Sequence, residues 1–339
     1  MNEIGHGAAI FAPAGLKLSA DESAFFRDYD PFGYILFARN IDSPGQVLAL
    51  TESLRSNVGR KAPILIDQES GRVQRLRAPY WREWAPPLDS VASYGSIPLA
   101  ARAMAIRMQI IAAELRAVGI DANCAPLADV PSPRTHPFLR NRCYGTTPES
   151  VTLISRAVAG GLLQGGVLPV LKHLPGHGRA MQDSHEELPR VDTAHDELSI
   201  ADFLPFKALR DLPMAMTAHI VYSAIDPTRP ATQSPEIIRL IREEIGFAGL
   251  LMTDDLMMKA LSGDLAERTE RSIRAGCDLA LHCSGDLAEM TAIASAAGNM
   301  GKKACDRATA ALAQRVTPPT VDIAALEAML ADLSRGAVP

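Results

Sequence analysis

The segment 172–185 holds the densest set of side chains that could do chemistry. It reads KHLPGHG at 172–178 and DSH at 183–185, which brings one lysine, three histidines and one aspartate together within 14 residues. The glycines and the proline predict a loop. Asp183 and His185 lie two residues apart, so their side chains can hydrogen-bond across a turn. A carboxylate partner fixes the tautomer of an imidazole and raises its basicity, which suits a general acid or base.

Two other interpretations of this segment stay open. The histidines and the aspartate can be solvated side chains of a surface loop, or they can bind a metal ion, because both residue types are metal ligands. HxH or HxxxH spacing on a regular element would favour the metal site more strongly. The run from His185 begins like the HExxH zinc motif, but Pro189 stands where the second histidine belongs, which excludes that motif.

Two adjacent carboxylates, Asp254 and Asp255, lie near the end of the apolar run 249–257. Side chains alternate between the two faces of a strand, so only one of these acids is expected to face a site beyond the strand. That acid can act as a nucleophile or an electrostatic stabiliser. The other is expected to begin the next helix, and the alternative is that both acids are helix caps.

Polar side chains also follow an apolar run at 67–75, which reads DQESGRVQR. Such carboxylates and arginines are typical of a loop that binds hydroxyl or carboxylate groups. The signal is weak alone, because polar loops are common, and an isolated arginine such as Arg142 is more often a surface residue than a ligand-binding one. No GxxxxGK[ST] sequence occurs, and Met181 replaces the third glycine of a GxGxxG pattern after Gly176 and Gly178, so nucleotide chemistry is not expected.

Eight short apolar runs recur along the chain, each about as long as a buried strand. They are near-continuous rather than alternating, which indicates parallel strands covered on both faces. The runs are 7–15, 34–40, 62–70, 121–130, 168–176, 215–223, 249–257 and 277–283. Apolar periodicity, helix starts and glycine stops predict helices between them. These are 98–118, 148–164, a helix from 235 that ends before Gly246, and 264–275.

Strands that alternate with helices in this way predict an α/β fold, a closed (β/α)8 TIM-type barrel, with a doubly wound open sheet as the alternative. Polar residues follow several of the runs, and the carboxyl ends of barrel strands converge on the face where active sites lie. One domain over residues 1–339 is the simplest organisation, since the sequence has no repeat or long linker. The stretch 320–339 is expected to form a C-terminal helix packed on the outside.

Composition and charge exclude several classes of function. Apolar residues make up 47% and charged residues 22%, which is typical of a globular protein, and the net charge of −5 argues against nucleic-acid binding. The five scattered cysteines include no CxxC pair, which indicates thiols in a reducing compartment. Without a long uncharged apolar run or a signal-peptide pattern, the sequence predicts a cytoplasmic protein that does not interact with a membrane.

Four motifs resemble those of a known family. DQESGRVQR, KHLPGHG, DSHEELP and MTDDLMM are similar, in this order, to the β-N-acetylhexosaminidases of glycoside hydrolase family 3, over about residues 5–300. The enzymes that the chain resembles are single-domain bacterial proteins that recycle cell-wall fragments. The KHLPGHG loop followed by DSH is specific to this branch, since the β-glucosidases of the family lack it.

The resemblance implies a retaining two-step glycosidase that needs no metal or other cofactor. Asp254 matches the nucleophile that forms a glycosyl ester, His185 matches the acid/base, and Asp183 matches its partner. The pair departs from the two-carboxylate scheme, but a histidine held by a carboxylate can donate a proton and then activate water. The residues that match sugar-binding positions are Asp67, Arg75, Arg142, Lys172 and His173.

The implied activity removes the non-reducing terminal N-acetylglucosamine (GlcNAc) from peptidoglycan fragments such as GlcNAc-1,6-anhydro-MurNAc, with or without a peptide stem. Three alternatives stay open: a phosphorylase that passes the sugar from the same Asp254 ester to phosphate, a non-catalytic sugar-binding barrel, and a metal-dependent hydrolase that uses the histidine-rich loop. The expected partner is a small carbohydrate. The sequence leaves the oligomeric state open, with a monomer as the default expectation.

Two positions depart from the pattern of the family. Ser70 stands where the family usually has the first glycine of DQEGGRV. If the backbone needs a positive φ there, serine costs about 1 kcal/mol of strain, and we expect a local adjustment rather than a loss of activity. Cys143 and Tyr144 replace a common Ser-Phe pair beside Arg142, which is a conservative change.

Overall fold

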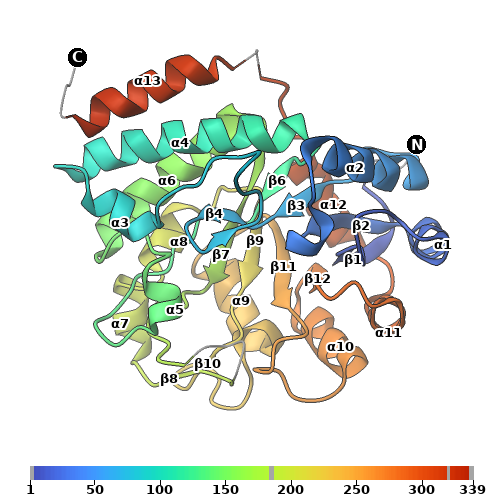
Figure 1. The fold of residues 1–339 in the computed structure, drawn as a ribbon. Helices are drawn as coiled ribbons and strands as arrows, with labels where there is room; N and C mark the ends of the chain where they lie inside the picture. The colour runs from blue at the N-terminus through green and yellow to red at the C-terminus, as the bar shows by residue number, and fades with distance from the viewer. Residues whose placement is uncertain (1–3, 183–186, 319–320, 336–339) are drawn as a thin grey trace.

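Parallel strands close into a barrel in the computed structural model, which describes residues 4–182, 187–318 and 321–335 (Figure 1). The barrel strands are β1 Gly7–Phe11, β2 Pro31–Leu36, β3 Ile64–Ile66, β6 Ala122–Asn123, β7 Leu168–Leu174, β9 Met214–Thr217, β11 Leu250–Asp255 and β12 Leu279–His282. They follow one another around the barrel in chain order, and β12 pairs with β1. Each apolar run of the sequence overlaps one of these strands.

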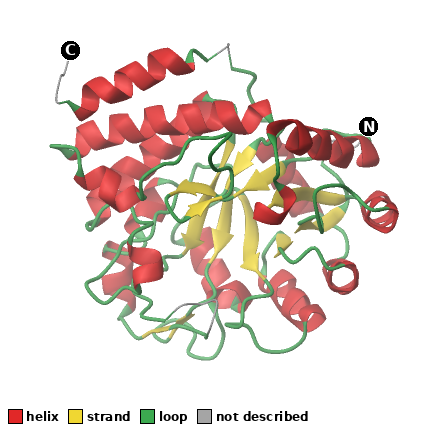
Figure 2. Ribbon diagram, in the orientation of Figure 1, coloured by secondary structure: helices red, strands yellow, loops and turns green. Residues whose placement is uncertain are grey.

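Helices connect consecutive strands and form the outer layer of the barrel (Figure 2). The connecting helices are α1 Ala20–Tyr29, α2 Pro44–Val58, α4 Ile97–Ala117, α6 Pro148–Gln164, α8 Leu204–Ala208, α9 Pro235–Glu243 and α10 Leu265–Ala275, and α11 Leu287–Ala297 follows the last strand, β12. The predicted single-domain (β/α)8 barrel is confirmed, and the open sheet is excluded because the first and last strands pair. Within the described ranges, no helix has the length and apolar character needed to cross a membrane.

Burial explains why the strands read as continuous apolar runs. Every residue of β1 and of β7 is buried, because one side of a barrel strand faces the interior and the other side packs under the helices. The largest buried side chains include Phe11, Phe26 and Tyr34 near the first two strands. All five cysteines are free thiols, and Cys124 is fully buried among the core residues.

Short extra elements occur in the loops after the carboxyl ends of the strands. β4 Gln68–Ser70 and β5 Val73–Gln74 form an antiparallel pair after β3, and β8 Arg190–Val191 pairs with β10 Val221–Tyr222. The others are η1 Ala38–Asn40, α3 Pro87–Ala92, α5 Pro137–Arg140, α7 His195–Ile200 and η2 Ala231–Gln233. These loops build the end of the barrel at which catalytic residues of this fold lie.

The C-terminal part of the chain lies outside the barrel. α12 Lys302–Leu312 is followed by α13 Ile323–Ser334, which lies along α4 (Figure 1). Leu333 of α13 packs in a small apolar cluster with Ile106 and Ile110 of α4. The predicted C-terminal helix therefore corresponds to α13, and its apolar face covers the outward face of α4.

Candidate active site

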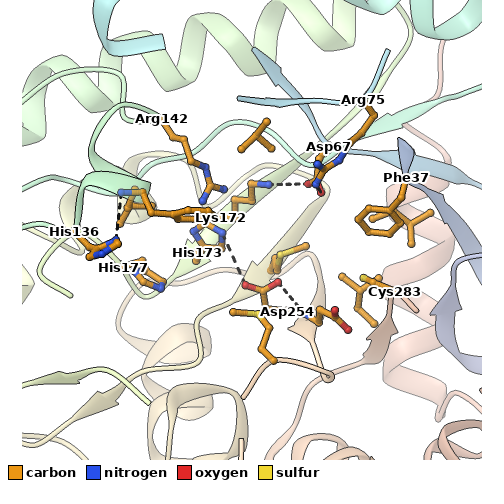
Figure 3. A pocket seen from close by; sticks show the side chains of 18 of the residues that line it. Phe37, Asp67, Arg75, His136, Arg142, Lys172, His173, His177, Asp254 and Cys283 are labelled. Atoms are coloured by element: carbon orange, nitrogen blue, oxygen red, sulfur yellow. Dashed lines mark hydrogen bonds and ion pairs between the residues drawn. The ribbon is translucent and has the colours of Figure 1, made fainter. Parts of the chain in front are cut away.

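A pocket opens at the carboxyl end of the barrel strands and encloses about 830 Å³ of empty space, its open mouth included. Figure 3 shows Asp67 and Arg75 on one side of the pocket, His136 and His177 on the other, and Asp254 between them. The predicted site residues that line this pocket are Asp67, Arg75, Arg142, Lys172, His173 and Asp254.

The carboxylate of Asp254 lies at the carboxyl end of β11. Its Oδ1 accepts a hydrogen bond of 2.8 Å from the backbone N–H of Asp255, and its Oδ2 lies 4.0 Å from Nε2 of His173. Burial alone would raise the pKa of Asp254, but the nearby His173 and His219 outweigh burial and lower the pKa below its ordinary value. The carboxylate is therefore ionised at neutral pH, as a nucleophile requires.

Asp255 also lines the pocket, so the prediction that only one of the two adjacent acids faces the site is wrong. The prediction assumed regular alternation, but the pairing of β11 with β12 is irregular between Met252 and Asp255. The Asp255 carboxylate accepts a hydrogen bond of 3.1 Å from the N–H of Met257 and so caps a turn. It does not begin the next helix, because Asp264 is the N-cap of α10.

Asp255 makes the stability of the protein depend on pH. Burial, reinforced by the charge of Asp254, raises the pKa of Asp255 to about 6, whereas an aspartate in the unfolded chain ionises near pH 3.9. The folded state therefore binds the proton more tightly, and this contribution to stability is lost as the pH rises from about 4 through about 6. We expect Asp255→Asn to remove that loss.

The measurement is urea unfolding of both proteins at about pH 4 and about pH 7.5. At each pH, the free energy of unfolding of wild type is subtracted from that of Asp255→Asn. This difference should be up to about 2 kcal/mol larger at the higher pH than at the lower pH. An equal difference between the two proteins at both pH values would contradict the assignment.

Two carboxylates and three cations form a cluster on one wall of the pocket, in which Glu69, Arg142 and Lys172 are buried and Asp67 and Arg75 are half-buried. Nζ of Lys172 lies 3.1 Å from Oδ1 of Asp67 and 2.5 Å from Oε1 of Glu69. Arg142 donates two hydrogen bonds of 2.8 Å to the carboxylate of Glu69, one to each oxygen. Arg75 donates from Nη2 to Oδ2 of Asp67 at 3.0 Å. The cluster joins the β3–β4 region, the loop after β5, β7 and the loop before α6.

Opposite charges keep this cluster ionised although most of it is buried. Burial favours the neutral carboxyl groups, but Lys172 and Arg75 hold the pKa of Asp67 well below its usual range, and Arg142 and Lys172 lower the pKa of Glu69. Burial likewise opposes the charged form of Lys172 and of Arg142, but the carboxylates raise both pKa values. The wall therefore presents fixed charges and hydrogen-bonding groups, which suit the hydroxyl groups of a sugar.

Glu69 also belongs to the site, although we did not predict it as a site residue from the sequence. It follows Asp67 at a spacing of two residues, and alternate residues of an extended chain share a face. The spacing could have identified Glu69 from the sequence, because it predicts that the two carboxylates point the same way.

Lys172 and His173 both face the pocket although they are neighbours on β7. The pairing of β7 with β9 is irregular between Leu171 and Leu174, and the Lys172–His173 peptide bond is cis. Nδ1 of His173 hydrogen-bonds to Oδ2 of Asp129 at 2.8 Å. Nothing in the sequence marked Asp129, which lies near the end of the apolar run 121–130 and is fully buried.

Further histidines and aromatic side chains line the pocket. His177 belongs to the predicted loop, and burial together with His173 lowers its pKa to about 4, so it is neutral at pH 7. His136 caps α5, where its Nδ1 accepts a hydrogen bond of 3.3 Å from the N–H of Phe138. The guanidinium of Arg72 lies 3.5 Å from the centre of the Phe138 ring. Among the residues that the structure describes, no group of three His, Cys, Asp or Glu side chains is arranged to hold a metal ion.

Comparison with known proteins identifies the family. The protein-family model described as the glycosyl hydrolase family 3 N terminal domain matches residues 7–317 of the chain. The chain belongs to glycoside hydrolase family 3. A β-hexosaminidase of Methylococcus capsulatus is 41% identical to it over 281 residues, which cover 81% of this chain and 82% of the relative. Together these matches confirm the resemblance that the motifs indicated.

Two solved structures share the fold. Native NagZ from Neisseria gonorrhoeae matches with a TM-score of 0.85 and 28% identity over 100% of each chain. NagZ from the same organism in complex with N-trifluoroacetyl-D-glucosamine matches with a TM-score of 0.80 and 29% identity, over 98% of this chain and 100% of that one. The prediction of a glycoside hydrolase of the β-N-acetylhexosaminidase type is confirmed.

Two of the predicted site residues of this family 3 chain, Asp183 and His185, lie outside the described residues. Gln182, the last described residue before them, lines the pocket. The roles predicted for Asp183 and His185 stay predictions, as do the catalytic and binding roles of the residues that the pocket brings together.

Ser70 adopts a backbone conformation that favours glycine, with φ of 107°. Its side chain is buried, and its hydroxyl has no hydrogen-bond partner among the described residues. Ser70 therefore has the positive φ at which we expect serine to strain this loop of the family 3 chain. We expect Ser70→Gly to raise the free energy of unfolding by about 1 kcal/mol, measured by urea unfolding.

Ser155 supplies a matched control for that substitution. It is also buried, and its hydroxyl also lacks a partner in the described structure, but it lies inside α6. Glycine destabilises the interior of a helix, so Ser155→Gly should lower the free energy of unfolding. A loss of stability in both variants would show that the conformation of Ser70 carries no strain.

Proposed function

We propose that the protein is a retaining exo-β-N-acetylglucosaminidase that removes the non-reducing terminal GlcNAc from peptidoglycan fragments such as GlcNAc-1,6-anhydro-MurNAc, with or without a peptide stem. The chain would act as one catalytic barrel over residues 1–339, as a monomer in the cytoplasm. Family membership and the resemblance to cell-wall-recycling enzymes support the substrate. The free state of the five cysteines supports a reducing compartment.

The observation that carries the proposal is the ionised carboxylate of Asp254 inside a pocket of sugar-binding character. The pocket combines the charged wall of Asp67 and Lys172 with apolar side chains such as Met216, Met258 and Leu281. Charged and polar groups can bind the sugar hydroxyls, while the apolar side chains offer a surface for the methyl of the acetamido group. A pocket of this kind favours an N-acetylated sugar over glucose.

In the first step the Asp254 carboxylate attacks the anomeric carbon of the bound sugar. The bond from that carbon to the leaving oxygen breaks, and His185, held by Asp183, donates a proton to the oxygen as the aglycone departs. In the second step His185 removes a proton from water, the water oxygen attacks the anomeric carbon, and the ester to Asp254 breaks. Two displacements at one carbon return the β configuration.

The test compares initial rates on 4-nitrophenyl β-N-acetylglucosaminide and on the corresponding β-glucoside, in buffers with and without phosphate. We expect turnover of the acetamido sugar, much slower turnover of the glucoside, GlcNAc as the product, and no dependence on phosphate. Release of GlcNAc 1-phosphate only when phosphate is present would assign the protein to the phosphorylases. Absence of turnover by the folded protein would leave a sugar-binding barrel, and inhibition by EDTA would indicate a metal-dependent hydrolase.

The proposed peptidoglycan substrate needs its own comparison. Rates on GlcNAc-1,6-anhydro-MurNAc, with and without a peptide stem, are measured beside rates on the GlcNAc disaccharide of chitin. Higher kcat/KM for the anhydro-muramyl substrates is expected, and higher kcat/KM for the chitin disaccharide would contradict the assigned substrate.

A further inference from the structure

Asp129 lies behind the pocket wall, fully buried, and holds the backbone and the side chain of His173 at once. Its Oδ1 accepts hydrogen bonds from the backbone N–H groups of His173 at 3.3 Å and of His177 at 2.6 Å. Its Oδ2 hydrogen-bonds to Nδ1 of His173 at 2.8 Å. One carboxylate therefore fixes both the chain path of the loop after β7 and the orientation of one imidazole.

The charge state of Asp129 decides which nitrogen of His173 carries the proton. Burial favours the neutral acid, but His173, His177 and the hydrogen bonds that they donate lower the pKa of Asp129. An ionised carboxylate can only accept hydrogen bonds, so Nδ1 of His173 must carry a proton. Nε2, on the opposite side of the ring, then faces the pocket and lies 4.0 Å from Oδ2 of Asp254 (Figure 3).

We propose that Asp129 is a positioning residue for the reaction, which it serves by fixing the tautomer and the orientation of His173 beside the nucleophile. The proposal rests on the proposed function, because it assigns His173 a contact with the bound sugar next to Asp254. With Nδ1 protonated, Nε2 of a neutral ring can accept a hydrogen bond from a sugar hydroxyl. With the other tautomer, Nε2 could only donate one.

Asp129→Asn separates this role from a purely structural one. The amide oxygen can keep both backbone hydrogen bonds, but the amide nitrogen must donate to Nδ1 of His173, which moves the proton of a neutral ring to Nε2. A change of tautomer with the geometry intact can strongly reduce catalysis. We expect kcat/KM on 4-nitrophenyl β-N-acetylglucosaminide to fall about 10- to 100-fold, while the melting temperature stays close to that of wild type.

The deciding measurement is a double-mutant cycle with His173→Gln, which removes the group that Asp129 is proposed to act through. In the His173→Gln background, Asp129→Asn should change kcat/KM by less than about twofold. The same fold-loss in both backgrounds, or no loss in either, would overturn the proposal. Asp226→Asn is the matched control, because Asp226 is also buried, accepts hydrogen bonds from Thr228 and Ser234, and does not line the pocket.

A second readout does not depend on turnover and so separates this proposal from the proposed function. The ¹⁵N chemical shifts of the His173 ring report which nitrogen carries the proton. In wild type we expect a protonated Nδ1, and in Asp129→Asn a protonated Nε2 with an unprotonated Nδ1. An unprotonated Nδ1 in wild type would overturn the proposal even if the enzyme is active, and a lack of turnover with the expected shifts would count against the proposed function alone.

Discussion

Asp254→Asn is expected to lower kcat on 4-nitrophenyl β-N-acetylglucosaminide by about 10⁴-fold or more, because an amide cannot form the glycosyl ester. Asparagine has the same shape as aspartate, and its side-chain oxygen can still accept the N–H of Asp255 at the position where Oδ1 does so now, 2.8 Å away. The fold and the binding of free GlcNAc should therefore persist. Steady-state rates and titration calorimetry with GlcNAc measure the two effects separately.

Asp332→Asn is a suitable control for the loss of one carboxylate. Asp332 lies on the exposed side of α13, where it pairs with Arg335 at 2.7 Å, and it has no contact with the pocket. Its substitution should leave kcat unchanged. If Asp254→Asn kept kcat within about tenfold of wild type while the control behaved as expected, Asp254 would not be the nucleophile.

The second large effect is expected for the proposed acid/base pair. His185→Ala should lower kcat/KM on GlcNAc-1,6-anhydro-MurNAc by on the order of 10³-fold, and Asp183→Asn should lower it less, because the imidazole remains but loses its orienting partner. The sugar alkoxide is a poor leaving group that needs protonation. The dinitrophenolate of a 2,4-dinitrophenyl glycoside leaves without a proton, so the first step on that substrate should be far less affected.

His195→Ala provides the matched histidine control. His195 is half-buried, pairs with Glu244 at 2.8 Å, and does not line the pocket. Its loss should leave both substrates unaffected. An equal loss on the two leaving groups in His185→Ala would show that His185 acts in binding or folding rather than in proton transfer.

The barrel could be predicted from the sequence because its strands have a distinctive pattern. Strands buried on both faces read as unbroken apolar runs, and β7 illustrates this, since all its residues from Leu168 to Leu174 are buried. The chain between two runs is then long enough for a helix. The runs alone do not show whether the sheet closes into a barrel. Closure depends on the pairing of β12 with β1, and these two strands are separated by most of the sequence.

The polar part of the pocket could be predicted only where regular geometry applies. Asp67 and Lys172 lie at or near the carboxyl ends of strands that the apolar runs predict, and such positions converge in a barrel. The orientation of Asp255 could not be predicted, because it follows from an irregular pairing of β11 with β12 that no local residue pattern announces. Asp129 was missed for a similar reason: a single acid near the end of an apolar run looks like many helix caps, and its partner His173 lies 44 residues away.

The identity of the nucleophile can be measured most directly by trapping the glycosyl ester. Incubation with the 5-fluoro derivative of β-N-acetylglucosaminyl fluoride should slow the second step and leave the sugar attached to the enzyme. Tryptic digestion then gives the peptide 243–259, which contains both Asp254 and Asp255, and fragment masses assign the modified residue. We expect a single glycosyl group on Asp254. A group on Asp255 or on any other residue, or continued turnover without labelling, would contradict this assignment.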